Sequence, residues 1–137
     1  MKSTPHILVS ITDQPGSYRL ISAGRRLADE QQLPLKVIAV LKNRQDEKNA
    51  DVMQTLYNLC AKYRAELTIL FHQNPALTVA ITAKQTDAAH LICSTPAVAG
   101  YDFIAFLRET LPDIPLSIVE ADGSIVTFPP CAVKTVS

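Results

Sequence analysis

Short apolar runs rich in β-branched residues recur along the chain, and this pattern is typical of buried strands. The first run, residues 7–11, reads Ile-Leu-Val-Ser-Ile and is followed by a group of turn-forming residues that includes Pro15 and Gly16. The second run, residues 35–41, is almost uninterrupted. By the same criterion five strands are expected, at residues 7–11, 35–41, 67–71, 91–93 and 116–119.

The segments between these runs have apolar residues at spacings of three and four, which indicates amphipathic helices. We predict helices from residue 17 to 32, from about residue 52 to 63, from residue 75 to about 87, and from residue 100 to 111. Asn74 and Pro75 suit the start of the third helix, as a cap and a first helical residue. The residues expected to face inward are Leu20, Ile21, Gly24, Leu27 and Ala28 in the first helix; Val52, Leu56, Leu59, Cys60 and Tyr63 in the second; Leu77, Ala80 and Ile81 in the third; and Phe103, Ile104 and Leu107 in the fourth.

The strict alternation of strands and helices with short links predicts an α/β fold with an open, doubly wound parallel sheet. We expect a single Rossmann-like domain over residues 1–137, with a core at about 6–120 and a tail at 121–137. Within the tail, Ile125, Val126 and Phe128 precede two prolines, so this segment is able to add a short edge strand.

Charge and composition narrow the function classes. Thirteen basic residues balance thirteen acidic ones, so no overall positive field favours nucleic acid or an anionic membrane. The apolar run near the start is too short for a signal peptide, and no other run approaches the roughly 20 residues of a membrane span. We therefore expect a cytoplasmic protein that binds neither nucleic acid nor membrane.

The order of these segments, together with several short phrases, resembles the universal stress protein (UspA-like) family. The phrases are the apolar run at 7–11, the Gln-Pro-Gly-Ser turn at 14–17, the Arg-Leu pairs at 19–20 and 26–27, and the Asn-Pro start of the third helix at 74–75. The first turn and helix are most similar to the universal stress domain of potassium-sensing histidine kinases. The resemblance covers residues 6–120 and implies a five-stranded parallel sheet in the order 3-2-1-4-5, frequent dimerisation, and ATP binding in one subgroup.

Two departures from the ATP-binding subgroup stand in the sequence. That subgroup has an acidic residue after the first strand and a glycine-rich motif, G-x2-G-x9-G-[S/T], after the fourth. Here Thr12 takes the acidic position, Asp13 follows one residue later, and residues 94–100 read Ser-Thr-Pro-Ala-Val-Ala-Gly. Because Pro96 lacks an amide donor and the three residues after it are not glycine, we expect no tight ATP binding.

The crevice outside the carboxyl ends of the first and fourth strands is the predicted ligand site, because the strand order reverses there. Its hydroxyl, amide and carboxyl groups would suit a small polar ligand, and the same residue types also form ordinary turns and caps. The candidate residues are Thr12, Asp13, Gln14, Gly16, Ser17, Ser94, Thr95 and Gly100.

The cysteines and histidines offer weaker candidates. Cys93 ends the fourth strand, where a helix N-terminus would lower its pKa, although a buried free thiol is the commoner role. We expect Cys60 in the core and Cys131 exposed in the tail. His6 and His90 begin adjacent strands, so they are either a metal pair or, as we favour, surface residues at strand ends, since no third ligand is evident.

These observations favour a universal stress protein-like regulatory or small-ligand-binding module that is not an enzyme and needs no cofactor or metal. A diverged nucleotide-binding protein with slow hydrolysis and a structural dimerisation or docking domain are the alternatives. We also expect a homodimer, because the fifth strand would be an edge with Ile118, Val126 and Phe128 as apolar surface, and a regulatory protein partner.

Overall fold

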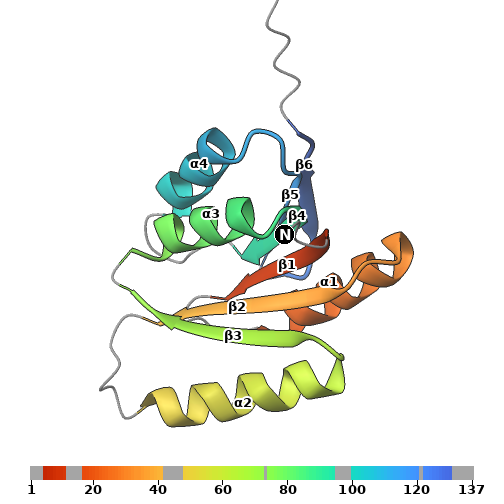
Figure 1. Ribbon diagram of the computed structural model, residues 1–137, viewed down its shortest axis with the longest axis vertical. Helices are drawn as coiled ribbons and strands as arrows, with labels where there is room; N and C mark the ends of the chain where they lie inside the picture. Colours follow the sequence, from red (N-terminus) through yellow and green to blue (C-terminus); the bar gives the residue numbers. More distant parts are fainter. Residues whose placement is uncertain are drawn as a thin grey trace, which may run out of the picture.

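The computed structural model describes residues 5–11, 17–41, 48–72, 74–94, 100–120 and 122–130. In these ranges a six-stranded sheet is flanked by four helices (Figure 1). The strands are β1 (His6–Ile11), β2 (Leu35–Leu41), β3 (Glu66–Phe71), β4 (Ala88–Ser94), β5 (Leu116–Val119) and β6 (Ile125–Phe128). The helices are α1 (Ser17–Gln31), α2 (Lys48–Lys62), α3 (Pro75–Gln85) and α4 (Gly100–Thr110).

The strand order is β3-β2-β1-β4-β5-β6, and β1 to β5 pair with one another in parallel. This confirms the predicted order and the α/β class. β6 pairs antiparallel with β5, with Val119 opposite Ile125 and Leu116 opposite Phe128. The edge strand expected from the tail therefore exists.

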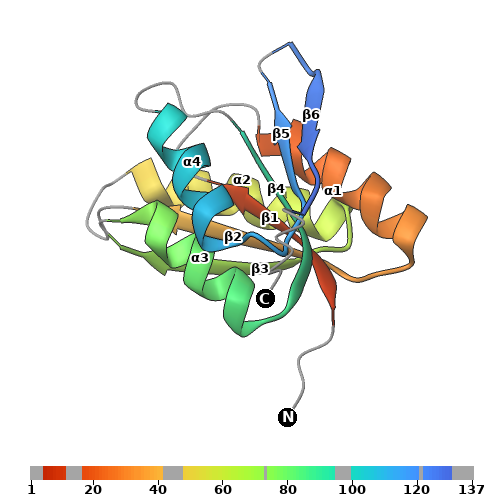
Figure 2. The ribbon, with the colours of Figure 1, turned by 90° about the horizontal axis from the view of Figure 1, so that it is seen from above.

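Helices cover the sheet on both faces (Figure 2). On one face α1 and α2 pack over a core that includes Ile7, Val9 and Ile92, and on the other α3 and α4 pack over Leu8, Leu91 and Cys93. Successive strand residues point to opposite faces, so an unbroken apolar run supplies both cores.

Gly24 sets how closely α1 lies to the sheet. A Cβ added at Gly24 would stand 2.5 Å from Val9 Cγ2 and 2.9 Å from Leu35 Cδ1. A side chain there would overlap the strands, so only glycine allows this approach. Leu20, Ile21 and Ala28 are buried on the same face of the helix, as predicted.

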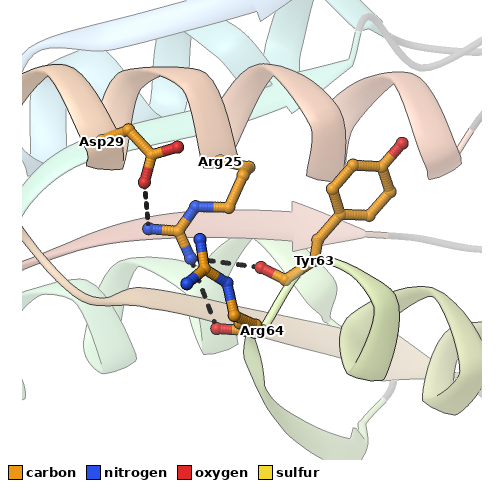
Figure 3. Close-up of polar contacts among 4 residues, drawn as sticks. All are labelled: Arg25, Asp29, Tyr63 and Arg64. Carbon is orange, nitrogen blue, oxygen red and sulfur yellow. Dashed lines mark hydrogen bonds and ion pairs between the residues drawn. The ribbon is translucent and has the colours of Figure 1, made fainter.

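Arg25 ties α1 to the end of α2 (Figure 3). Its Nη1 donates to the carbonyl oxygens of Tyr63 at 3.1 Å and Arg64 at 3.4 Å, and its Nη2 pairs with Asp29 at 2.8 Å. The last carbonyls of a helix lack partners within the helix and carry partial negative charge. The guanidinium therefore joins the two helices that share this face.

Two packing predictions were wrong. In α3 the inward residues include Val79, Ala80 and Ala83, while Leu77 and Ile81 are exposed. The helix is apolar around most of its circumference, so its sequence did not single out one face, and the small residues allow the closest contact.

The second correction concerns the sheet edge. Because β6 covers β5, β5 is an interior strand and Ile118 is buried rather than available as surface. Phe128 is half-buried against the α3 and α4 side, and the Arg108 guanidinium lies 4.3 Å from the centre of its ring. Val126 is exposed as expected.

Candidate functional site

The carboxyl ends of β1 and β4 meet at the centre of the sheet, where Val9 is level with Ile92. From β1 the chain continues to β2 on one side, and from β4 it continues to β5 on the other. α1 begins at Ser17 after β1, and α4 begins at Gly100 after β4. Two helix N-termini, each with partial positive charge, thus follow the strands that flank the reversal of strand order.

The predicted site residues fall into two groups. Ser94 is the last residue of β4 and is half-buried, while Ser17 and Gly100 are the first residues of α1 and α4. These three therefore occupy the expected end of the sheet. Five others lie outside the described residues: Thr12, Asp13, Gln14, Gly16 and Thr95.

Ser10, which the sequence analysis did not single out, belongs to the same end of the sheet. It is the next-to-last residue of β1, it is buried, and its Oγ has no hydrogen-bond partner in the described part of the chain. Buried hydroxyls are normally satisfied, so this one calls for a partner. A serine within an otherwise apolar strand was the available signal in the sequence.

A second polar arrangement lies on the α1 side of β4, β5 and β6. His90 Nε2 is 2.7 Å from Ser117 Oγ, and Ser117 Oγ is 2.9 Å from Thr127 Oγ1. The three residues come from three adjacent strands and form a hydrogen-bonded row across them. They line an open groove of about 290 Å³ whose remaining walls are Ala23, Arg26, Leu27, Glu30, Ile92, Val119 and Ile125.

The row has two consistent proton arrangements. Either the imidazole donates from Nε2 to Ser117 and the Ser117 hydroxyl donates to Thr127, or Thr127 donates to Ser117 and Ser117 donates to Nε2. Burial lowers the pKa of His90 below its ordinary value of 6.5, because the charged form would lose hydration. The ring is therefore neutral at pH 7.

This placement corrects the prediction for the histidines. His6 contacts Thr86 on the α3 side, with Nε2 3.3 Å from Thr86 Oγ1, whereas His90 faces the α1 side. Both are buried, so neither the metal pair nor the pair of surface residues describes them. Across the ranges that the structure describes, no three histidine, cysteine or acidic side chains are grouped for a metal.

The two described cysteines are core residues. Burial raises the pKa of Cys60 to about 11 and that of Cys93 to about 12. A thiol with such a pKa is almost entirely protonated at neutral pH and is a poor nucleophile. The commoner role of a buried thiol therefore fits Cys93, Cys60 is in the core as expected, and Cys131 lies outside the described residues.

Comparison with known proteins gives matches among solved structures. No family model matches the chain, and no curated protein does. The structure of the universal stress protein from Archaeoglobus fulgidus in complex with dAMP aligns with a TM-score of 0.60 and 17% identity, over 78% of this chain and 90% of that one. A second structure of universal stress protein from Archaeoglobus fulgidus aligns with a TM-score of 0.62 and 16% identity, over 74% and 91%.

At such identities the likeness concerns the fold. The more specific resemblance to potassium-sensing histidine kinases gains no support from these structures and stays a prediction. Within the described ranges, no helix has the length and apolar character needed to cross a bilayer. The chain has the Rossmann-like α/β fold of the universal stress proteins, with one further antiparallel strand at the edge of the sheet.

Proposed function

We propose that this chain is a universal stress protein-like regulatory module that binds a small polar ligand in the crevice that the strand order predicts at the carboxyl ends of β1 and β4. The observation that carries the proposal is that α1, which starts at Ser17, and α4, which starts at Gly100, are the elements that follow the two strands flanking the reversal. Amide groups at helix N-termini favour an anionic group. The hydroxyls of Ser94 and Ser10 lie on the two strands that lead there.

A nucleotide is the first ligand class to test, because one structural neighbour is a complex with dAMP. The sequence after β4 argues for weak binding of a triphosphate, since Pro96 and the residues Ala-Val-Ala that follow it replace glycines whose amides approach phosphate. Losing two or three charge-assisted hydrogen bonds, at roughly 1.5 to 3 kcal/mol each, would weaken affinity by several powers of ten. We therefore favour a ligand no larger than a nucleoside monophosphate, with a millimolar Kd.

Thermal unfolding with dAMP, inorganic phosphate and magnesium ATP tests this proposal. A ligand at about ten times its Kd adds roughly 1.4 kcal/mol, which raises the Tm of a domain of this size by about 4 °C. We expect such a rise when dAMP reaches about ten times its Kd, a smaller rise with phosphate at the same concentration, and with ATP a rise no larger than that with dAMP. The rise should disappear in Ser94→Ala and Asp13→Ala and persist in Ser124→Ala, a matched change in the β5–β6 turn.

Three results would contradict the proposal or part of it. If dAMP and phosphate leave the Tm unchanged, the crevice does not bind an anionic ligand, and a docking role gains ground. If ATP binds at micromolar concentration, the argument from Pro96 is wrong and the diverged nucleotide-binding alternative holds. If hydrolysis of ATP accompanies binding and is lost in Asp13→Ala, the module is an enzyme.

We further propose that the chain forms a homodimer through β6. Within the described ranges the strand pairs with β5 alone, and its Ile125 and Val126 are exposed. Edge strands with apolar side chains favour pairing with another chain. Sedimentation at tens of micromolar should show a dimer that Val126→Lys converts to monomer, and a wild-type monomer under these conditions would contradict the proposal.

A further inference from the structure

The groove on the α1 side lies away from the carboxyl-end crevice. Its polar residues His90 and Ser117 stand near the starts of β4 and β5, and its helical wall comes from the second half of α1. α1 covers β1 and β4 on this face, whereas α3 and α4 occupy the other face. The groove therefore exists because the sheet extends beyond α1 on this face, at β5 and β6.

The groove is mainly apolar, with one buried group that is able to recognise a ligand. Ala23, Leu27, Ile92, Val119 and Ile125 supply its apolar surface. Within it His90 is only 7% exposed, and its single hydrogen bond in the described part of the chain joins Nε2 and Ser117 Oγ. The second ring nitrogen, Nδ1, makes no hydrogen bond within the described ranges, so it is able to pair with a molecule bound beside the ring.

The row of hydroxyls makes Nδ1 adaptable. If His90 donates from Nε2 to Ser117, Nδ1 accepts; if Thr127 and Ser117 donate toward Nε2, Nδ1 carries the proton and donates. Ser117 and Thr127 are able to switch by rotating their hydroxyl groups. A ligand hydroxyl, which both donates and accepts, matches either arrangement.

Charges at the groove argue for a neutral ligand. Arg26 and Glu30, both exposed on α1, contribute one charge of each sign and form no ion pair in the ranges described. The imidazole between the apolar walls is neutral at pH 7, so a charged group placed beside it would lose hydration without gaining an opposite charge.

We propose that this groove binds a small, neutral, mainly apolar molecule with one hydroxyl group, of the size and chemistry of a substituted phenol. The ring packs between Leu27, Ile92 and Val119, and the hydroxyl pairs with Nδ1 of His90. A volume of about 290 Å³ is at the lower end for small-molecule sites, so it suits a single ring and no larger drug-like molecule. The proposal is independent of the crevice and of dAMP.

Titration of 15N-labelled protein with 4-methylphenol, toluene and 4-methylbenzoate, followed by NMR, tests the inference. These probes share one ring and differ in having a hydroxyl, no polar group or a negative charge. We expect 4-methylphenol to shift the His90 ring signals and the amides of α1, β4 and β5 with a millimolar Kd. Toluene should bind about tenfold more weakly, because one hydrogen bond is lost, and 4-methylbenzoate more weakly still.

Two variants localise the site. Ala23→Leu fills the groove and should abolish the shifts while the rest of the spectrum stays folded. Ser117→Ala removes the partner of Nε2 and should reduce the preference for 4-methylphenol over toluene to about twofold or less, while toluene still binds. Thr68→Ala, which deletes a hydroxyl from an exposed position of β3, is the matched control and should change the affinity for neither 4-methylphenol nor toluene.

The possible contrary results are distinct. Equal affinity for toluene and 4-methylphenol would show an apolar hollow without recognition by His90 and would overturn the inference. Tighter binding of 4-methylbenzoate would mark a site for anions at Arg26 instead. Groove signals that shift with protein concentration alone, together with a dimer in sedimentation, would show that a second copy occupies the groove. If dAMP stabilises Ala23→Leu as much as the wild type, a failure of the groove proposal leaves the proposed function of the crevice unaffected.

Discussion

The two faces of the β4–β5–β6 half of the sheet differ in what covers them. On the α3 and α4 face, Leu116 and Ile118 are buried with Leu107, and Phe128 packs at the margin. On the α1 face, the alternate residues of β5 and β6 are Ser117, Val119, Ile125 and Thr127, and they border a groove. Helices cover the first face across β5, whereas on the second face they stop near β4.

This difference shows that the alternation of apolar and polar residues along a strand depends on which of its faces a helix covers. β5 reads Leu-Ser-Ile-Val, so its apolar residues at 116 and 118 meet α4 while Ser117 takes part in a hydrogen-bonded row. A serine that is buried on a helix-free face needs partners from neighbouring strands, and His90 and Thr127 supply them. The covered face is stabilised by packing and the open face by hydrogen bonds.

Truncation of one leucine on each face should show the largest difference in stability between the two faces. Leu107→Ala empties a fully buried position on the side of α4 that faces the sheet and should lower the free energy of unfolding by about 2 to 5 kcal/mol. Leu27→Ala, at the half-buried groove wall, should cost less than half as much, because water and neighbouring atoms fill the space. Urea unfolding followed by circular dichroism measures both, and equal costs would mean that the groove is as tightly packed as the core.

The close approach of α1 to the sheet gives the next largest effect. Gly24→Ala places a methyl group against Val9 and Leu35, and overpacking of this kind should cost about 2 kcal/mol even though alanine favours helix. The groove wall moves with the helix, so the variant should also alter binding of 4-methylphenol. Ala23→Gly, on the neighbouring half-buried position, serves as the control for helix propensity. A neutral or stabilising Gly24→Ala would refute the tight contact.

Loss of the hydroxyl row should be smaller. Ser117→Ala leaves His90 Nε2 without its partner and should lower stability by about 1 kcal/mol. Thr127→Val, at the exposed end of the row, should cost a few tenths of that amount, since water replaces the lost contact. Chemical unfolding of both variants beside Thr68→Ala makes the comparison, and a larger loss for Thr127→Val would place the important end of the row at β6.

The smallest expected effect is a dependence of stability on pH that originates on the open face. Since burial lowers the pKa of His90, the unfolded chain takes up a proton near pH 6.5 while the native protein does not. Stability from this residue is therefore complete above pH 6.5 and falls as pH decreases toward the native pKa. The difference in unfolding free energy between wild type and His90→Gln, measured from pH 8 to pH 5, should narrow with acidification; a constant difference would exclude the titration.

The fold was largely readable from the sequence, and the polar arrangement was not. The apolar runs that became β1 and β2 and the cap at Asn74 specify local structure, and Asn74 Oδ1 indeed accepts from the amide of Leu77. The row of His90, Ser117 and Thr127 joins residues that are distant in sequence, and its register depends on β6 pairing antiparallel with β5. Residue spacing does not place these three side chains beside one another, and a histidine expected at the surface was found in the interior.

For the candidate ligand residues, the sequence predicted the position in the fold and not the contacts. The alternation of elements locates the reversal between β1 and β4, and so the ends where Ser94, Ser17 and Gly100 stand. Ser10 was not predicted as a site residue, because a single serine does not disturb the apolar pattern of the strand. Its unsatisfied hydroxyl becomes evident only in the folded protein, where β1 is packed between two helical layers. For Thr12, Asp13, Gln14, Gly16 and Thr95 the prediction stands untested.

The turns that close the helices have a consequence for engineering. Gln32, Arg64 and Asp87 follow α1, α2 and α3 with φ of 57°, 56° and 56°, a conformation that costs an L-residue roughly 1 kcal/mol and costs glycine little. All three stand before β2, β3 and β4, at the opposite end of the sheet from the crevice. Glycine at these positions offers a route to a more heat-resistant protein that leaves ligand affinity in the crevice intact.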